Sequence, residues 1–550
     1  MRNHQKRYPS GGSIQPTLLL LLLTACSAPE PSTLADFPIQ WRYSAREMAV
    51  TAESGIVVST DEYATRVGVE VLQAGGNAID ASIAVQFALA VVNPEAGNIG
   101  GGGFMVVRTA EGETAALDYR EKAPLDASRD MFLDPEGNLT NKSVVGHLAA
   151  GVPGTVSGMA AAHDRYGTLP WADLVQPAVE LAEGFEVKER FLGSLSETMV
   201  EALTAYPASA SQFLPRNGAP PVVGDTLRQL DLASTLNRIR DEGPDGFYTG
   251  QTADLIVAEM ERGGGIMTHQ DLQSYEAAWR DPISFSYREH TIISMPPSSS
   301  GGATMAEIAN ILEGYDLGGM SWHSAEQIHL FAEAARRAYA DRNHYLADPD
   351  FVEMPLERMT SSSYASERAA TISTSAATPS TNVGPGMEGD PGESEETTHF
   401  SIVDAAGNAV SVTTTINSWY GSKVTVEGAG FVLNNEMDDF AAKPGTPNQF
   451  GLVQGEKNAI GPGKRMLSAM SPSIVLDPDD KLLMVTGTPG GSTIIAATAS
   501  MLLNTLDLYD DGEGVGDGEG EADGETYDLW RWECEHYRQS TVCVQRCPSS

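Results

Sequence analysis

The chain has 550 residues, of which 41% are hydrophobic and 20% are charged, a composition typical of a globular protein with a sizeable core. Its formal net charge is −39, and so acidic a chain lacks the basic footprint that nucleic-acid binding requires. A dense cluster of carboxylates falls in the segment 507–528, but the rest of the chain is acidic as well. The length allows several domains or one large α/β domain.

The N-terminal residues have the pattern of an export signal, 1–25. Basic residues at the start precede a short apolar run, 18–23. The residues Leu-Thr-Ala-Cys that end at Cys26 resemble a bacterial lipobox, which predicts lipidation of Cys26; an ordinary signal peptide is the alternative. The residue after the cysteine is Ser27 and not aspartate, and by resemblance to lipoprotein sorting patterns this favours the outer membrane. We therefore expect an exported, periplasmic protein that touches the membrane only through a lipid anchor, followed by a tether, 26–45.

The other cysteines are confined to the end of the chain. Cys534, Cys543 and Cys547 lie in the C-terminal tail, and the body has no disulfide framework although export would permit one. With His536 they offer metal ligands, but their spacing matches no common zinc pattern, and we expect no metal site.

Two helices are predicted near the start of the globular part. Ser59 and Glu62 have the spacing of a capping box, and apolar residues follow at helical intervals as far as Gly75. Asn77 is predicted to cap the second helix. That helix is apolar all round through Val92, which predicts that it is buried.

A glycine run, 100–103, leads into a predicted strand, 104–107, and a return strand, 114–119. A phosphate-binding loop is the alternative interpretation of these glycines. The run lacks the Lys-Ser/Thr ending of such a loop, and it precedes a strand instead of a helix. We therefore expect a tight connection between buried elements.

The middle of the chain, 160–345, is predicted to be mostly helical, with a long helix from 324 to 342. A segment rich in proline, glycine and acids, 378–396, then predicts an unpacked linker. The histidines of the helical region are interpreted as packing residues and not as catalysts: His163, His323, His329 and His344.

Two β-hairpins are predicted after the linker. The first pairs 398–403 with 409–416, and the second pairs 473–476 with 482–486. Five residues rich in glycine, 487–491, then precede a helix that runs to about residue 506. Unpaired backbone N–H groups at such a helix start favour an anion.

Five motifs, in order along the chain, resemble those of the γ-glutamyltransferase (γ-glutamyl transpeptidase) family of N-terminal-nucleophile hydrolases. The ordered set is far more specific than any one motif. The motifs are Asp118–Pro124, Gly151–Gly154, Glu396–Phe400, Leu433–Phe440 and Thr486–Ser492.

This resemblance implies an α/β (α+β) fold with four layers, αββα, and a precursor that cleaves itself between Glu396 and Thr397. The large subunit would be 46–396 and the small subunit 397–506. Relatives continue with further strands and a helix where the resemblance stops, so we expect the C-terminal part of the fold to be missing. The segment 507–550 is interpreted as a frameshift or gene-model artefact, and a genuine, cation-binding acidic tail is the alternative.

The resemblance makes Thr397 the catalytic nucleophile. After cleavage its hydroxyl would attack and its new α-amine would accept the proton. An α-amine has a pKa of about 7.7–8.0, so it can act as a base near neutral pH, unlike a lysine amine near about 10.4. By the same motifs Thr415 supports the nucleophile, and Gly490 and Gly491 form the oxyanion hole.

The same resemblance supplies a receptor for the substrate's amino-acid head. Arg120 and Ser468 would bind the α-carboxylate, and Asn417, Glu436 and Asp439 would surround the α-ammonium group. Even without the family, one arginine with two acids suits a zwitterion. Bacterial relatives usually carry two serines where this chain has Ser468-Ala469, which predicts weaker substrate binding with the chemistry intact.

The implied reaction is two-step transfer of a γ-glutamyl group, without metal or organic cofactor. Thr397 attacks the γ-amide carbonyl of a substrate such as glutathione, and the ester then passes to water or to an amino-acid or peptide amine. Two alternatives remain: a related acylase acting on glutaryl β-lactams or γ-polyglutamate, and an uncleaved, inactive surface lipoprotein. The loop Lys443–Asn458 resembles a lid that suits small substrates.

Overall fold

Two antiparallel sheets stack at the centre of the computed structural model, which describes residues 52–321, 324–384, 397–509 and 542–543. In hydrogen-bonding order, the first sheet contains β1 (Gly55–Val58), β9 (Thr398–Asp404), β10 (Ala409–Thr415), β2 (Gly102–Arg108), β3 (Thr114–Asp118) and β6 (Ala278–Arg280). The second contains β13 (Val542–Cys543), β12 (Leu482–Thr486), β11 (Ser473–Leu476), β8 (His290–Ser294) and β7 (Ile283–Tyr287), and β4 (Phe185–Glu186) pairs separately with β5 (Thr226–Leu227).

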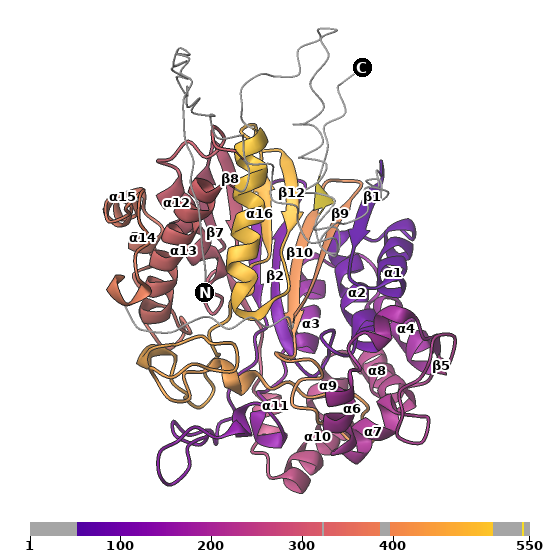
Figure 1. Cartoon of the computed structure of the whole chain (residues 1–550). Helices are drawn as coiled ribbons and strands as arrows, with labels where there is room; N and C mark the ends of the chain where they lie inside the picture. Colours follow the sequence, from indigo (N-terminus) through magenta and orange to yellow (C-terminus); the bar gives the residue numbers. More distant parts are fainter. Residues whose placement is uncertain (1–51, 322–323, 385–396, 510–541, 544–550) are drawn as a thin grey trace, which may run out of the picture. The chain divides into compact units, whose positions relative to one another are not determined.

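Helices cover the outer face of each sheet, which confirms the predicted αββα layering (Figure 1). On the first sheet lie α1 (Glu62–Gln73), α2 (Ala78–Val92) and α3 (Thr155–Tyr166). Further out, α4 (Trp171–Glu183) packs on α2, and α8 (Leu230–Glu242) packs on α4. On the second lie α12 (Gly301–Leu312) and α16 (Ile494–Tyr509). Further out, α13 (Ala325–Tyr345) and α15 (Ser362–Ala369) pack on α12. The remaining helices are α5 (Glu189–Leu192), α6 (Glu197–Thr204), α7 (Pro207–Phe213), α9 (Asp245–Tyr248), α10 (Gly250–Gly263), α11 (His269–Gln273) and α14 (Leu356–Met359).

Strand β2 is buried on both faces. Met105 and Val107 point into the core shared with α2, whereas Phe104 and Val106 point into the core shared with the second sheet. Successive side chains of a strand alternate between faces, so a strand between two cores needs apolar residues at consecutive positions. This explains the continuous apolar run from which the strand is predicted.

The two N-terminal helices form as predicted, but one cap differs. Asp61 caps α1, because its side chain accepts a hydrogen bond from the Tyr63 N–H at 2.8 Å; the capping box expected from Ser59 is wrong. Asn77 caps α2 and forms a capping box with Asp80, as the sequence predicts. Every residue of α2 is buried.

The predicted helical region, 160–345, also holds five strands, β4 to β8, that the sequence analysis missed. The long helix of this region is α13, capped by Ser324. The glycine run 100–103 is the tight connection predicted, since a Cβ at Gly100 would lie 2.1 Å from the Val432 carbonyl oxygen. A phosphate loop would need an open cradle there.

Helix α16 continues to Tyr509, past the expected end of the small subunit. Asp507 is buried and accepts hydrogen bonds from the Tyr287 hydroxyl at 2.9 Å and from Arg288 Nε at 2.8 Å. Strand β13 pairs with β12 at the edge of the second sheet. The signal segment, Cys26, the tether and the rest of the tail lie outside the described residues. Within the described part of the chain, no helix combines the length and apolarity needed to cross a membrane.

Candidate active site

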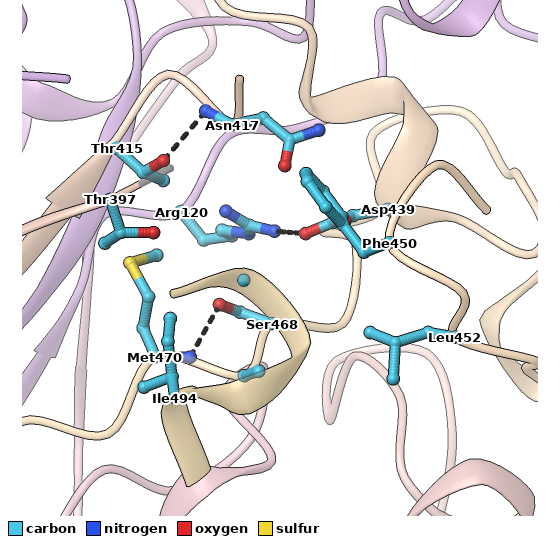
Figure 2. Close-up of a pocket in the computed structure, with 12 residues that line it drawn as sticks. Arg120, Thr397, Thr415, Asn417, Asp439, Phe450, Leu452, Ser468, Met470 and Ile494 are labelled. Atoms are coloured by element: carbon cyan, nitrogen blue, oxygen red, sulfur yellow. Dashed lines mark hydrogen bonds and ion pairs between the residues drawn. The ribbon is translucent and has the colours of Figure 1, made fainter. Parts of the chain in front are cut away.

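A pocket with about 320 Å³ of free space, partly open to solvent, lies beside the end of β10 (Figure 2). It brings together most of the predicted site residues, from both sides of the predicted cleavage point. Two predicted site residues do not line the pocket themselves: Glu436 contacts Arg120, and Gly490 directly precedes Gly491 in the wall. The predicted residues in its wall are Arg120, Thr397, Thr415, Asn417, Asp439, Ser468 and Gly491.

Thr397 and Thr415 lie opposite each other at the ends of β9 and β10. The hairpin register pairs Thr398 with Thr414 and His399 with Thr413, so one further step brings Thr397 to Thr415. Figure 2 shows both side chains facing the pocket. The backbone N–H of Asn417 donates to Thr415 Oγ1 at 2.8 Å, and this bond orients the Thr415 hydroxyl.

Arg120 is buried beside three carboxyl groups. Its Nη1 lies 2.8 Å from Glu436 Oε2 and 3.6 Å from Glu121 Oε2, and its Nη2 donates to Asp439 Oδ2. Burial disfavours the guanidinium charge, but Glu436 and Asp439 outweigh burial and raise the pKa of Arg120. One cation therefore faces three acids. A ligand ammonium group beside these carboxyl groups would favour their charged forms.

Glu121 is a site residue to which the sequence analysis gave no role. It is fully buried, and within the described residues neither of its carboxyl oxygens accepts a hydrogen bond. Burial raises the pKa of Glu121 to about 8, against the lowering effect of Arg120. Gly102 leaves room for it, because a Cβ there would lie 2.7 Å from Glu121 Oε2. The sequence signal that could have pointed to Glu121 is its position directly after Arg120 in the motif Asp118–Pro124.

Asn417 turns the chain sharply after β10. Its φ of 73° is left-handed, a conformation that asparagine adopts more readily than most residues. Its Nδ2 donates to the Asn435 carbonyl at 2.9 Å, which joins the turn to the segment that carries the two acids. The side chain of Asn434 accepts from the Glu436 N–H at 3.0 Å. These bonds hold the acidic turn Glu436–Asp439 against the end of β10.

Gly490 and Gly491 form the connection from β12 to α16. Both have positive φ, 132° and 52°, and a short 3-10 turn, Gly491–Thr493, precedes the helix. Within the described part of the chain, neither backbone N–H donates a hydrogen bond. Two such donors at the start of a helix suit a negatively charged oxygen.

Ser468 and Ala469 line the pocket next to each other. The Ser468 hydroxyl accepts a hydrogen bond from the Met470 N–H at 3.1 Å, and its carbonyl accepts one from the Ser300 N–H at 2.8 Å. Ala469 is buried and offers only a methyl group at this wall.

Ala469→Ser should therefore lower KM for the γ-glutamyl donor by about tenfold, the effect of one added hydrogen bond to a charged group. We expect kcat to stay unchanged, because the added hydroxyl would bind the head group and not the reacting carbonyl. Steady-state kinetics of the parent and the variant test this. An unchanged KM would show that the missing serine does not limit binding.

Apolar side chains that the sequence analysis did not assign complete the pocket. Met470 and Ile494 form one wall, and Phe450 and Leu452 reach in from the predicted lid loop (Figure 2). The neighbouring Gln449 donates its backbone N–H to Asp438 Oδ2 at 3.0 Å and accepts from Ser418 Oγ at 2.9 Å. The loop is thus tied to the acidic turn.

Comparison with known families matches residues 64–514 to the family model described as gamma-glutamyltranspeptidase. The chain belongs to this family. It is 49% identical over 466 residues to the glutathione hydrolase proenzyme of Pseudomonas sp. (strain A14), which covers 84% of this chain and 80% of that protein. It is 37% identical over 490 residues to the acylase ACY 1 proenzyme of Pseudomonas sp. (strain V22), with 88% and 84% covered.

Among solved structures, the γ-glutamyltranspeptidase of Helicobacter pylori superimposes with a TM-score of 0.60 and 45% identity, and it covers 61% of this chain and 97% of that one. Membership of the γ-glutamyltranspeptidase family confirms the resemblance inferred from the motifs. It also makes the chain an enzyme with an N-terminal-nucleophile hydrolase fold.

Proposed function

We propose that the chain is a γ-glutamyltransferase and glutathione hydrolase that matures by cutting itself between Glu396 and Thr397. The observation that carries this proposal is Arg120, which is held between Glu436 and Asp439 in the wall of the pocket that Thr397 also lines. A γ-glutamyl group presents an α-carboxylate and an α-ammonium on one carbon. An arginine flanked by acids can bind both charges.

In the proposed reaction the freed α-amine of Thr397 takes the proton of its own hydroxyl, and Oγ1 attacks the γ-amide carbonyl. Gly490 and Gly491 donate to the oxyanion, where the loss of one donor costs about 3 kcal/mol. The carbon–nitrogen bond then breaks, and the leaving amine takes the proton. Water or an acceptor amine attacks the ester by the same route and restores Thr397. Thr415 orients the nucleophile.

The roles in substrate binding follow from the charges. Arg120 and Ser468 hold the α-carboxylate of the donor, and Asn417, Glu436 and Asp439 hold its α-ammonium. Binding therefore exchanges the internal ion pairs of Arg120 for pairs with the substrate, so that no buried charge loses its partner.

An acylase for glutaryl groups is the competing function, and one of the relatives is named an acylase. A glutaryl group lacks the α-ammonium and would leave Glu436 and Asp439 facing an uncharged carbon chain. Turnover of γ-glutamyl p-nitroanilide and glutaryl p-nitroanilide separates the two. We expect at least a hundredfold preference for the γ-glutamyl compound, roughly the effect of one unpaired buried charge. A preference for the glutaryl compound would overturn the proposal.

Substrate binding should weaken in acid. Burial raises the pKa of Asp439 to about 6, against the lowering effect of Arg120. Below that pH Asp439 gains a proton and can no longer pair with the substrate ammonium. KM for the γ-glutamyl anilide should therefore rise roughly tenfold per pH unit below about pH 6, as expected for one proton. KM measured from pH 5 to pH 8 tests this, with Asp439→Asn as the control that should lose the rise near pH 6; the pH dependence that remains in it belongs to Glu436 and Glu121, whose pKa burial also raises. A KM independent of pH would contradict it.

We further propose that Cys26 carries a lipid and anchors the enzyme on the periplasmic side of the outer membrane, because residues 23–26 fit a lipobox. In a bacterial host, the wild type should incorporate radiolabelled palmitate and Cys26→Ala should not. Equal labelling of the two proteins would rule this out.

A further inference from the structure

The proposed mechanism leaves one buried imidazole unused. His399 lies on β9, two residues after Thr397, and its side chain is completely buried. Its Nδ1 lies 2.8 Å from Thr413 Oγ1, directly across the hairpin, and its Nε2 lies 3.1 Å from Ser401 Oγ. The ring thus bonds to both strands that end at the pocket.

The hydrogen-bond network assigns the proton of this ring. The Val485 carbonyl accepts a hydrogen bond from the Ser401 hydroxyl at 3.2 Å, an arrangement in which Ser401 Oγ accepts from His399 Nε2–H. Thr413 then donates to Nδ1. Burial lowers the pKa of His399 to about 3, which keeps the imidazole neutral near neutral pH. The ring is therefore a fixed connector with both nitrogens satisfied.

The same ring packs against the start of the loop that carries Gly490 and Gly491. A Cβ at Gly487 would lie 2.5 Å from His399 Cε1 and 2.6 Å from Nδ1, too close for any real side chain. Gly487 follows β12 directly, and it is not among the glycines with positive φ. The ring therefore excludes even a methyl group there, whereas the backbone conformation would tolerate one.

We propose that His399 is a positioning residue that sets the distance between the nucleophile strand and the oxyanion loop. It contacts β9, which begins after Thr397, β10, which ends at Thr415, and Gly487, three residues before Gly490. A displacement of about 1 Å between nucleophile and oxyanion donors can lower a rate by about 10²-fold. This role rests on the proposed function, because it needs Thr397 and the glycine donors to act on one carbonyl.

A double-mutant cycle between His399 and Gly487 tests the proposal. Gly487→Ala should lower kcat for γ-glutamyl p-nitroanilide by about 10²-fold, because the new methyl pushes the loop away from the ring. In His399→Ala the methyl finds space, so adding Gly487→Ala should change kcat by less than about threefold. KM should stay within about twofold throughout. If the kcat loss of the double variant equals the product of the losses of the two single variants, the proposal is overturned.

Turnover is expressed per active site, titrated with an electrophilic glutamine analogue, so that poor folding does not imitate a slow reaction. Ser411→Ala is the matched control: it removes a neighbouring hydroxyl bridge, at 2.9 Å, from β10 to the Thr486 carbonyl without touching the ring. It should lower the melting temperature but leave kcat per site within about twofold. If Ser411→Ala lost as much kcat per site as His399→Ala, the effect of His399 would be one of general packing, and the proposal would be overturned.

Two further readouts keep the test decisive. His399→Ala should lower the height of the kcat–pH profile and leave its apparent pKa values unchanged; a lost limb would show acid–base catalysis instead. Where a variant matures too slowly for kcat to be measured, its rate of self-cleavage replaces kcat. The same non-additivity is then expected among variants whose precursors have the melting temperature of the Thr397→Ala precursor. Wild-type turnover tests the proposed function by itself, so its failure is distinguishable from failure of this cycle.

Discussion

Thr397→Ala should abolish both self-cleavage and turnover, with a loss in kcat on the order of 10⁵-fold or more, as for removal of a catalytic nucleophile. The variant lacks the hydroxyl that attacks the Glu396 carbonyl in the precursor, so the base on the new N-terminus never forms. Denaturing gel electrophoresis and the anilide assay measure the two losses. Thr397 lies opposite Thr415 in the pocket.

Two neighbouring variants serve as controls for this prediction. Thr397→Ser keeps the hydroxyl and the α-amine, and it should cleave and turn over more slowly, because serine lacks the methyl group that stiffens χ1. Thr398→Val changes the next residue, whose hydroxyl lies 2.8 Å from Thr60 Oγ1, away from the pocket. It should cleave and react like the wild type. A Thr397→Ala protein that still splits at this bond would exclude Thr397 as the agent.

Arg120→Lys should lower kcat/KM for the γ-glutamyl donor by about 10²-fold or more, as expected when a buried ion pair loses its geometry. Lysine keeps the positive charge but cannot contact Glu436 and Asp439 through two nitrogens at once, as Arg120 does. The loss should appear chiefly in KM, since the reacting carbonyl lies at the other end of the substrate. Steady-state kinetics across donor concentrations measures the split.

Arg280→Lys is the matched control for Arg120→Lys. Arg280 is also bound to two acids, Asp118 at 3.3 Å and Asp350 at 2.7 Å, but it does not line the pocket. The two variants should lose similar thermal stability, and only Arg120→Lys should raise KM. Equal KM values for the two variants would remove Arg120 from substrate binding.

Local patterns predicted the elements that carry the nucleophile. The strands β9, β11 and β12 begin where turn residues and apolar runs place them, and Asn77 caps α2 as its spacing predicts. These features depend on residues close together in the chain. The bounds of β11 and β12, 473–476 and 482–486, are those the sequence indicates.

Contacts between distant segments could not be predicted in this way. Strands β6, β7 and β8 lie between helices, and β8 pairs with β11 across a long stretch of sequence. The motif resemblance supplied the identity of the site residues, and the fold brings most of them to one pocket. It did not indicate that Glu121 is buried beside Arg120, or that His399 fits against Gly487. Both depend on packing between elements that the sequence does not place in space.

The proposed mechanism is tested most directly by whether Thr397 becomes a free N-terminus and reacts as the nucleophile. Purified protein can be trapped with 6-diazo-5-oxo-L-norleucine, an electrophilic glutamine analogue, and its fragments sequenced by mass spectrometry. We predict a small fragment that begins at Thr397 and carries the adduct on that residue. An uncleaved chain, or an adduct on any other residue of a cleaved one, would contradict the central claim that Thr397 is both the product of maturation and the nucleophile.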